Sequence, residues 1–552
     1  MRIALLLLVL SCGQPAVQPA ANGTATPAPT AGGSAYYDLI IRNGTVIDGT
    51  GSPRYRADVG IRGDAIVKIG DLKSATAKQT LDATNHIVAP GFIDLLGNSQ
   101  AAVLIDPNLE GKIRQGVTTE VTGEGHSPAP IDEKMAAEME RTKPKGWPAV
   151  SWRSFADFGR VVQQKGSALN FAFYIGATNP REIVLGDAPR DPSPEELRRM
   201  QQIVEQAVKE GAVGVASALI YPPGRHAKTE ELIALAKAAP SYWTHLRSES
   251  TNIDAAIDEA VRIGREAKVP VNIFHLKIGG QTNWGRMPEV VARIERARKS
   301  GVDVASCVYP YTATSTAMES FIPAWALEGG YVQFVARLKD PATRARIAQG
   351  LREGRLANNG AQTILVRGIR SETMKQYERL RLDEIARRMN TDPAEAALRL
   401  FESSVSSPIG IYFSLDENDL KVALKQPWVA VCSDSGAVVG EMRNEGAHPR
   451  AYGTFARILR YVREEKLLTL EETIRKMTSL AAQRAALRDR GLLKEGMRAD
   501  VVVFNAETVR DVSTYEDPHH FSEGVAHVVV NGVAVLRDAK MTGALPGRIL
   551  GR

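Results

Sequence analysis

The chain of 552 residues contains few cysteines, and the apolar run near its start is too short to cross a bilayer. Its three cysteines are Cys12, Cys307 and Cys432, and the last two lie within apolar, strand-like stretches. We expect those two to be packed thiols, so the sequence predicts no disulfide framework.

A block of basic residues is also missing, although the net charge is +6 and the pI is near 9.0. Lysine and arginine alternate with aspartate and glutamate along predicted helices such as residues 194–210, which is typical of solvated helix faces. We therefore expect no nucleic-acid partner. The length suits one large catalytic domain and a smaller one.

The first 35 residues have the composition of an export and tethering segment. Arg2 and the apolar run at residues 3–10 are typical of a secretory signal. Val9-Leu10-Ser11-Cys12 resembles the lipobox of bacterial lipoproteins, which implies a signal over residues 1–12 and a lipid on Cys12. Residues 13–35, rich in Gly, Pro, Ala and Thr, suit a flexible linker. We expect an exported protein, periplasmic or tethered to the outer membrane, that contacts the membrane only through Cys12; an ordinary signal peptide is the alternative.

Short alternating stretches at both ends of the remaining chain predict a small β domain. They occur within residues 36–90 and recur at residues 499–504 and 527–536. Alternation of this length, bounded by glycine-containing turns, is typical of antiparallel strands. We expect a β-sandwich formed jointly by residues 36–90 and 491–552.

Helices and strands alternate between these ends, over residues 91–490. Gly116, Gly211 and Gly301 each end a predicted helix and precede a β-branched run. Repetition of this pattern indicates an α/β fold, the (β/α)₈ TIM barrel. The charged, mostly helical stretch at about residues 324–419 exceeds one barrel unit, so we expect a helical insertion over the mouth of the barrel.

Two histidines, His245 and His275, each end a short apolar run. The residues between them predict an amphipathic helix, because apolar side chains recur at Ile253, Ala256, Ile257, Ala260 and Val261. A strand-helix-strand crossover has parallel strands, so both histidines emerge at the same edge of the sheet. A single histidine there would be interpreted as a satisfied polar residue, but two at equivalent positions indicate zinc.

The order of several short motifs resembles the amidohydrolase superfamily, and within it the N-acyl-D-amino-acid deacylase (D-aminoacylase) family. The resemblance extends from Tyr37 to about Leu536. It is carried by Ala89-Pro-Gly-Phe-Ile-Asp94, Tyr221-Pro-Pro-Gly224, Thr244-His245-Leu-Arg247, His275-Leu-Lys277, Tyr309-Pro-Tyr-Thr, Cys432-Ser-Asp434 and His448-Pro-Arg450. It implies a zinc-dependent hydrolase of linear amides that removes acyl groups from N-acyl-D-amino acids with a metal-activated water.

The sequence departs from the family at the expected metal ligands. The first barrel strand usually supplies His-x-His, but these positions are Leu96 and Asn98. The deacylases can also use a cysteine after the second strand, whereas this loop contains Glu124 and His126. A carboxylate with two histidines is a recognised catalytic zinc set, so we expect one zinc ion on Glu124, His245 and His275. His126 is the alternative third ligand.

The resemblance also implies roles around the substrate. Asp434 matches the catalytic aspartate, which takes a proton from water and passes it to the leaving amine. A cap on the following turn is the alternative for this aspartate. Arg450 matches the residue that binds the substrate carboxylate in a bidentate manner. Simple packing at strand ends is the alternative for four further residues that match substrate-pocket positions: Lys277, Tyr309, Ser315 and Tyr221.

Two other functions stay open at this point. A non-catalytic binding lipoprotein would have kept the barrel and lost the metal chemistry, but retention of both histidines, Asp434 and Arg450 argues against it. A cyclic-amide hydrolase commonly bridges two metals with a carboxylated lysine, and no lysine stands at a convincing strand end.

Overall fold

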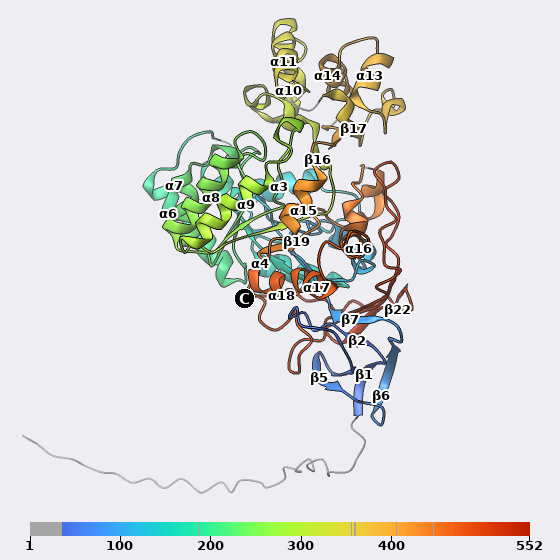
Figure 1. The fold of residues 1–552 in the computed structure, drawn as a ribbon. Helices are drawn as coiled ribbons and strands as arrows, with labels where there is room; N and C mark the ends of the chain where they lie inside the picture. Colours follow the sequence, from blue (N-terminus) through green and yellow to red (C-terminus); the bar gives the residue numbers. More distant parts are fainter. Residues whose placement is uncertain are drawn as a thin grey trace, which may run out of the picture.

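Three parts are stacked along the molecule: a small β domain, a barrel, and a helical subdomain (Figure 1). The computed structural model describes residues 36–186, 188–354, 356–357, 360–404, 406–444 and 446–551. The expected signal and linker, residues 1–12 and 13–35, lie outside the described residues. No helix within the described ranges is long and apolar enough to cross a membrane.

Parallel strands form the central barrel. Two ladders run in the orders β10-β9-β8 and β11-β12-β13-β14-β15-β19, and every neighbouring pair is parallel. β10 and β11 are separated only by Tyr174 and act as the two halves of one strand, which joins the ladders. The strands are β8 (Phe92–Asp94), β9 (Val117–Thr122), β10 (Asn170–Phe173), β11 (Ile175–Gly176), β12 (Val215–Ala218), β13 (Tyr242–His245), β14 (Val271–Ile273), β15 (Val304–Val308) and β19 (Val429–Val431).

No hydrogen-bonded ladder joins β8 to β19 among the described strands. Side chains close the barrel between these two strands instead. The backbone N–H of Ser433 donates to Asp94 Oδ1 at 2.8 Å, and its hydroxyl donates to Asp94 Oδ2 at 2.5 Å. Lys112 Nζ donates to Asp94 Oδ2 and to Ser433 Oγ, both at 2.8 Å. All three side chains are fully buried. The predicted TIM barrel is thus confirmed, and its closure fixes the residue that precedes Asp434.

Helices surround the strands, as the glycine pattern predicts. Gly116, Gly211 and Gly301 all adopt positive φ, at 86°, 108° and 90°. The apolar side chains of α8 between His245 and His275 are buried as expected. The barrel helices are α1 (Ala102–Ile105), α2 (Glu110–Ile113), α3 (Glu133–Thr142), α4 (Phe155–Lys165), α5 (Thr178–Leu185), α6 (Pro194–Lys209), α7 (Thr229–Lys237), α8 (Ile253–Ala267), α9 (Met287–Lys299), α15 (Glu417–Leu424), α16 (Arg450–Glu465), α17 (Leu470–Met477) and α18 (Ser479–Arg484).

Both ends of the described chain build the β domain. One sheet has the order β5-β4-β1-β6, and the other, β23-β22-β21-β20-β7-β2-β3, combines N-terminal with C-terminal strands. Buried residues of both sheets, such as Ile41, Val59, Val88 and Val503, share one core. The strands are β1 (Tyr36–Arg42), β2 (Thr45–Val46), β3 (Tyr55–Arg56), β4 (Asp58–Arg62), β5 (Ala65–Gly70), β6 (Thr76–Asp82), β7 (Ile87–Pro90), β20 (Val501–Phe504), β21 (Val525–Val530), β22 (Val533–Arg537) and β23 (Lys540–Met541).

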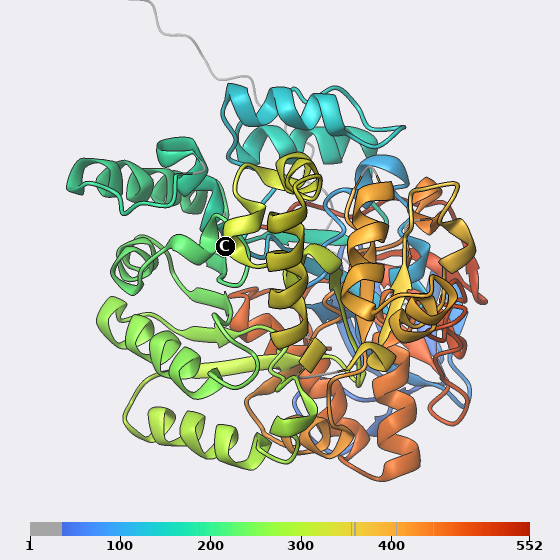
Figure 2. The same ribbon diagram turned by 90° about the horizontal axis from the view of Figure 1, so that it is seen from above.

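The insertion lies over the end of the barrel, where its yellow and orange helices are seen from above (Figure 2). Its edges differ from the expected 324–419. It is framed by a small antiparallel sheet of order β16-β18-β17, and the next helix, α15, packs on the barrel helix α9 instead. The elements are β16 (Thr314–Ala317), α10 (Gly330–Arg337), α11 (Pro341–Glu353), β17 (Ile364–Arg367), α13 (Leu382–Arg388), α14 (Pro393–Ser403) and β18 (Ile409–Tyr412).

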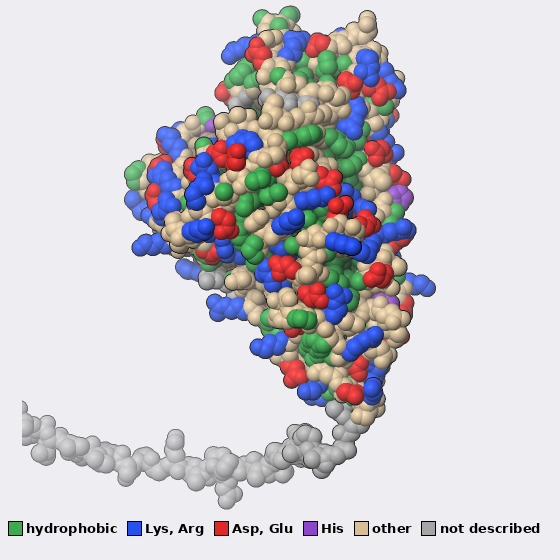
Figure 3. Space-filling view, in the orientation of Figure 1, with side chains coloured by type: hydrophobic (Ala, Val, Ile, Leu, Met, Phe, Trp, Pro, Cys, Tyr) green, Lys and Arg blue, Asp and Glu red, His purple; other side chains and the backbone are tan. Residues whose placement is uncertain are grey.

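On the face drawn in Figure 3, positive and negative side chains are interspersed over all three parts. This face presents no continuous stripe of one charge.

Candidate active site

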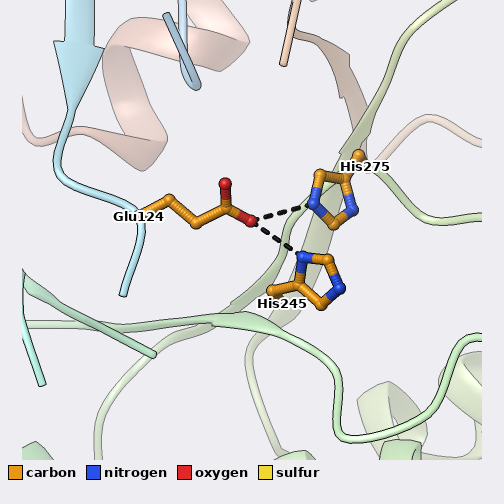
Figure 4. Close-up of side chains that lie close together, drawn as sticks. All are labelled: Glu124, His245 and His275. Carbon is orange, nitrogen blue, oxygen red and sulfur yellow. Dashed lines mark hydrogen bonds and ion pairs between the residues drawn. The ribbon is translucent and has the colours of Figure 1, made fainter. Parts of the chain in front are cut away.

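Glu124, His245 and His275 meet at the carboxyl ends of the barrel strands (Figure 4). His245 is the last residue of β13, His275 follows β14, and Glu124 follows β9. Glu124 Oε1 lies 2.9 Å from His245 Nδ1 and 3.0 Å from His275 Nε2. One ligand atom from each residue lies within 4.8 Å of the others. Two nitrogens and one carboxylate oxygen therefore converge on one point, with a geometry suited to a metal ion.

The local backbone explains how Glu124 reaches the histidines. Gly123 and Gly125 flank it with φ of 118° and 62°, in the region that favours glycine. A Cβ on Gly123 would lie 2.4 Å from the Tyr174 carbonyl oxygen, so only glycine allows this close approach. His275 itself has a φ of 34°, a costly conformation that the packing of the strand end imposes.

The electrostatics of the cluster suit a cation. Burial raises the pKa of Glu124, but hydrogen bonds from His245 and His275 outweigh this and hold it well below its usual range. Burial and Lys277 act to lower the pKa of His275, yet Asp434, Glu249 and Glu124 raise it to about 10. Lys277 and Arg450 balance two of these three carboxylates, so the site keeps one net negative charge beside two imidazoles, and this charge with an O and N donor set fits zinc.

Glu249 belongs to the site, although the sequence analysis did not identify it. Its Oε1 accepts a hydrogen bond from Lys277 Nζ at 2.7 Å and lies 3.0 Å from His275 Nδ1. Its Oε2 lies 3.4 Å from His245 Nε2. Glu249 therefore lies beside the nitrogens of both histidines that point away from Glu124, although the hydrogen-bond partner of His275 Nδ1 is Lys277 Nζ at 2.7 Å and His245 Nε2 has no hydrogen-bond partner among the described residues. The available signal was an acidic residue four positions after His245.

His126 lies elsewhere. Its side chain is about half exposed, and Nε2 lies 3.2 Å from Glu182 Oε2. The turn at Gly125 directs the side chains of Glu124 and His126 to different sides, and only Glu124 lines the cavity. The geometry favours Glu124 over His126 as a metal ligand.

A cavity of about 440 Å³ is lined by Glu124, His245 and His275 and by the other residues that the sequence analysis selected for the site. Arg450 Nη1 donates to Asp434 Oδ2 at 2.8 Å, and the Arg450 guanidinium lies 4.9 Å from the centre of the Tyr309 ring. The selected residues on its wall are Glu124, His245, His275, Asp434, Arg450, Lys277, Tyr309, Ser315 and Tyr221.

Four buried polar atoms of the described residues that line this cavity lack a hydrogen-bond partner: Arg450 Nε, the Tyr309 hydroxyl, His245 Nε2 and Ser320 Oγ. Burial raises the pKa of Tyr309 well above its ordinary value, so its hydroxyl stays a donor. Buried unpaired donors are costly, and an acceptor group of a bound substrate would satisfy both Arg450 Nε and the Tyr309 hydroxyl.

Tyr221 and Ser315 connect two walls of the cavity. The Tyr221 ring centre lies 5.6 Å from that of His245, and its hydroxyl lies 3.0 Å from Thr316 Oγ1. The Ser315 carbonyl oxygen accepts a hydrogen bond from Arg450 Nη2 at 3.4 Å. The insertion therefore supplies part of the wall through β16.

Leu96 and Asn98, which stand in place of His-x-His, lie in different environments. Leu96 is fully buried among apolar side chains of the barrel interior, whereas Asn98 lines the cavity. A leucine side chain offers no ligand atom, so the first strand does not present the usual pair of metal ligands.

Comparison with known proteins confirms the resemblance seen in the motifs. The model of the amidohydrolase family matches residues 175–536. The N-acyl-D-glutamate deacylase of Alcaligenes xylosoxydans xylosoxydans is 37% identical over 529 residues, which are 93% of this chain and 96% of the relative. The solved N-acyl-D-glutamate deacylase of Bordetella bronchiseptica, in complex with zinc and a phosphonate mimic of the tetrahedral intermediate, is 32% identical with a TM-score of 0.78. That comparison covers 94% of this chain and 100% of the solved one.

A solved D-aminoacylase gives a similar match, with 33% identity and a TM-score of 0.78 over 94% of this chain and 100% of that chain. It is described as having a binuclear metal centre, with one-metal activation and second-metal attenuation. The chain belongs to the amidohydrolase family and, within it, to the N-acyl-D-amino-acid deacylases, metal-dependent hydrolases of linear amide bonds.

Proposed function

We propose that this enzyme removes the acyl group from N-acyl-D-amino acids and that it uses one zinc ion, held by Glu124, His245 and His275. The observation that best supports this proposal is the convergence of these three side chains beside Asp434 and Arg450 in one cavity. The D-amino-acid specificity of the deacylase relatives supports the choice of substrate.

A zinc ion bound there supplies Lewis-acid activation of water and of the amide carbonyl. Asp434 acts as the general base and acid: its carboxylate accepts the proton of the attacking water and returns it to the leaving nitrogen. Arg450 holds Asp434 Oδ2, which orients the carboxylate and leaves Oδ1 for proton transfer. Glu249 holds Lys277, whose Nζ contacts His275 Nδ1 at 2.7 Å, and so helps to position that ring.

The substrate carboxylate is the acceptor for the unpaired donors. Arg450 and Tyr309 line the cavity, Arg450 Nε and the Tyr309 hydroxyl have no partners among the described residues, and a guanidinium next to a neutral phenol suits a carboxylate. We assign this position to the α-carboxylate of the amino acid. Lys277, Ser315 and Tyr221 complete the walls around it.

The proposal of one metal ion rests on the first strand. In this chain Leu96 is packed in the barrel interior, where it offers no ligand atom. Within the described ranges, Glu124, His245 and His275 are the one cluster of His, Cys, Asp or Glu side chains with metal-binding geometry. A second, tightly held ion has no comparable ligand set.

Metal content and substrate profile test the proposal together. Elemental analysis of metal-replete protein should give about one zinc per chain, and two tightly bound equivalents would contradict the single-metal site. Hydrolysis should require an N-acyl-D-amino acid with a free carboxylate, and be slower on the L-enantiomer and on the carboxyl-amidated analogue. A profile without preference for chirality or carboxylate would contradict the substrate assignment.

A further inference from the structure

Four cationic side chains line the cavity, and three of them are matched by carboxylates. Arg247 Nε and Nη2 each donate to Glu259 at 2.9 Å. Lys277 pairs with Glu249 at 2.7 Å, and Arg450 pairs with Asp434 at 2.8 Å. These three charges are therefore balanced inside the protein.

Arg225 is the fourth cation and differs from the others. Arg225 lines the cavity, yet its guanidinium makes no hydrogen bond or ion pair with any residue in the described part of the chain. The side chain is half-buried, and burial lowers its pKa with no carboxylate to oppose the effect. A partly desolvated guanidinium without a partner costs stability, so the fold itself gains nothing from this charge.

The backbone of Arg225 is nevertheless held in place. Its N–H donates to the Tyr221 carbonyl at 2.8 Å, and its own carbonyl accepts from Arg247 Nη1 at 3.0 Å. It lies in a short 3₁₀ turn, Gly224–His226, in the loop after β12. An unpaired, partly desolvated charge on a held backbone costs stability, and such a cost is found where function requires it.

Arg225 and Arg450 belong to neighbouring walls of the same cavity. The loop of Arg225 touches β16 through the hydrogen bond between the Tyr221 hydroxyl and Thr316 Oγ1. β16 in turn carries Ser315, whose carbonyl binds Arg450. Arg225 and Arg450 thus offer one guanidinium on each of two adjoining walls of one cavity, an arrangement that suits a small molecule with two carboxylates.

We infer that Arg225 binds a second carboxylate, on the side chain of the amino acid, and that the enzyme prefers N-acyl derivatives of acidic D-amino acids. This inference rests on the proposed function, in which Arg450 and Tyr309 hold the α-carboxylate. A guanidinium binds carboxylates in a bidentate manner, and hydrogen bonds to charged groups are among the stronger ones in proteins. The 37% identity with an N-acyl-D-glutamate deacylase agrees with this substrate class.

The test compares N-acetyl-D-glutamate with its neutral isostere N-acetyl-D-glutamine and with N-acetyl-D-leucine. The parent enzyme should favour the glutamate substrate in kcat/KM by about ten- to a hundredfold over the glutamine substrate. Arg225→Gln should abolish this preference and leave kcat/KM for the two neutral substrates unchanged. Arg225→Lys should restore part of it, because it keeps the charge but loses the bidentate geometry.

Lys228→Gln is the matched control. Lys228 is exposed, pairs with Asp191 and lies outside the cavity, three residues after Arg225. Like Arg225→Gln, Lys228→Gln removes one positive charge from this loop, and it should leave the preference for the glutamate substrate intact. The melting temperature of Arg225→Gln should equal or exceed that of the parent, since no internal contact is lost.

Binding to metal-depleted protein provides a readout that does not need turnover. N-acetyl-D-glutamate should bind about ten- to a hundredfold more tightly than N-acetyl-D-glutamine, and Arg225→Gln should remove the difference. Equal binding and equal hydrolysis of the two by the parent would overturn the inference. An equal loss of kcat/KM on all substrates in Arg225→Gln would also overturn it. A loss of N-succinyl-D-leucine hydrolysis in Arg225→Gln would do the same, because it would place the Arg225 charge against the acyl group. Failure to hydrolyse any N-acyl-D-amino acid would instead refute the proposed function, while the binding comparison would still decide the role of Arg225.

Discussion

Arg450 Nη1 and Asp434 Oδ2 form a 2.8 Å hydrogen bond, so the residue that binds the substrate carboxylate also orients the residue that moves the proton. Both side chains are mostly buried, at 8% and 13% exposure. The φ of 51° at Asp434 is a further sign that the site imposes this orientation. A substitution at Asp434 should therefore affect mainly turnover, whereas one at Arg450 should affect both carboxylate binding and turnover.

Asp434→Asn should retain the fold and the bound metal but lose most of its turnover. The amide is nearly isosteric and cannot accept the proton, and general acid-base assistance is worth about a hundred- to ten-thousandfold. We expect the loss mainly in kcat, measured with N-acyl-D-amino acids under saturating substrate. Arg450→Ala should raise KM for substrates with a free carboxylate, much less for amidated analogues, and should also lower kcat on both because Asp434 Oδ2 loses its hydrogen bond. If Arg450→Ala loses kcat as Asp434→Asn does but leaves KM unchanged on both kinds of substrate, the role of Arg450 in carboxylate binding is wrong.

Glu124→Ala should lose the metal, whereas His126→Ala should keep it. Glu124 lies about 3 Å from both histidines, while His126 contacts Glu182 outside the cavity. Removing a direct ligand should weaken metal binding by more than the ten- to hundredfold typical of residues that only orient ligands. Metal retained after dialysis against a graded series of chelator concentrations measures this. Retention by Glu124→Ala and loss by His126→Ala would exchange the two assignments.

Local patterns were sufficient to predict the frame of the site. His245 and His275 end strands separated by one helix whose apolar spacing is visible in the sequence, and a parallel crossover then dictates that they share an edge. Asp434 and Arg450 were found through motifs of a known family. Glu124 followed because its loop lacks the cysteine that the family can use.

Other features depend on contacts that no local pattern encodes. Glu249 joins the site because the loop after β13 folds back onto His275, and its spacing from His245 alone does not show this. The partner of Ser433, Asp94, lies 339 positions earlier in the chain. Whether an arginine in the cavity has a carboxylate partner, the observation that distinguishes Arg225, likewise appears only in three dimensions. The sequence did not predict the short strands of the insertion, because charged, helical stretches flank them.

Export and lipid attachment at Cys12 stay predictions, since this residue lies outside the described part of the chain. Cys12→Ala should move the enzyme from the membrane fraction to the soluble fraction of the producing bacterium without changing its specific activity. One acyl chain anchors a protein only marginally, so stable attachment requires the several chains of a bacterial lipoprotein. Equal membrane association of the variant and the parent would refute the lipoprotein interpretation.

Beneath the active site, the carboxylates of Asp94 and Glu120 both lie near the ammonium group of Lys112. Asp94 and Glu120 are directly paired in the β8–β9 ladder, and Lys112 Nζ lies 2.8 Å from Asp94 Oδ2 and 3.6 Å from Glu120 Oε2. All three side chains are fully buried. Burial raises the pKa of Glu120 to about 7, with Asp94 acting in the same direction and Lys112 against it.

This shift predicts a pH-dependent cost in stability. The folded protein binds the Glu120 proton more tightly than the unfolded chain, whose carboxyl has an ordinary pKa near 4.5. The stabilising contribution is therefore fully present below pH 4.5 and is lost as the pH rises to about 7.

Glu120→Gln should remove that dependence, because a neutral amide does not ionise. The free energy of unfolding of the variant, relative to the parent, should increase by about 3 kcal/mol between pH 4.5 and pH 8, the equivalent of the shift in pKa. Urea unfolding at several pH values measures the difference, in which the titration of all other groups cancels to first order. Glu205→Gln, on the exposed face of α6, is the matched control and should show no such trend. A difference that stays constant with pH, or that falls as the pH rises, would mean that Lys112 keeps Glu120 ionised throughout and that the ion pair, rather than a shared proton, holds the barrel closed next to Asp434.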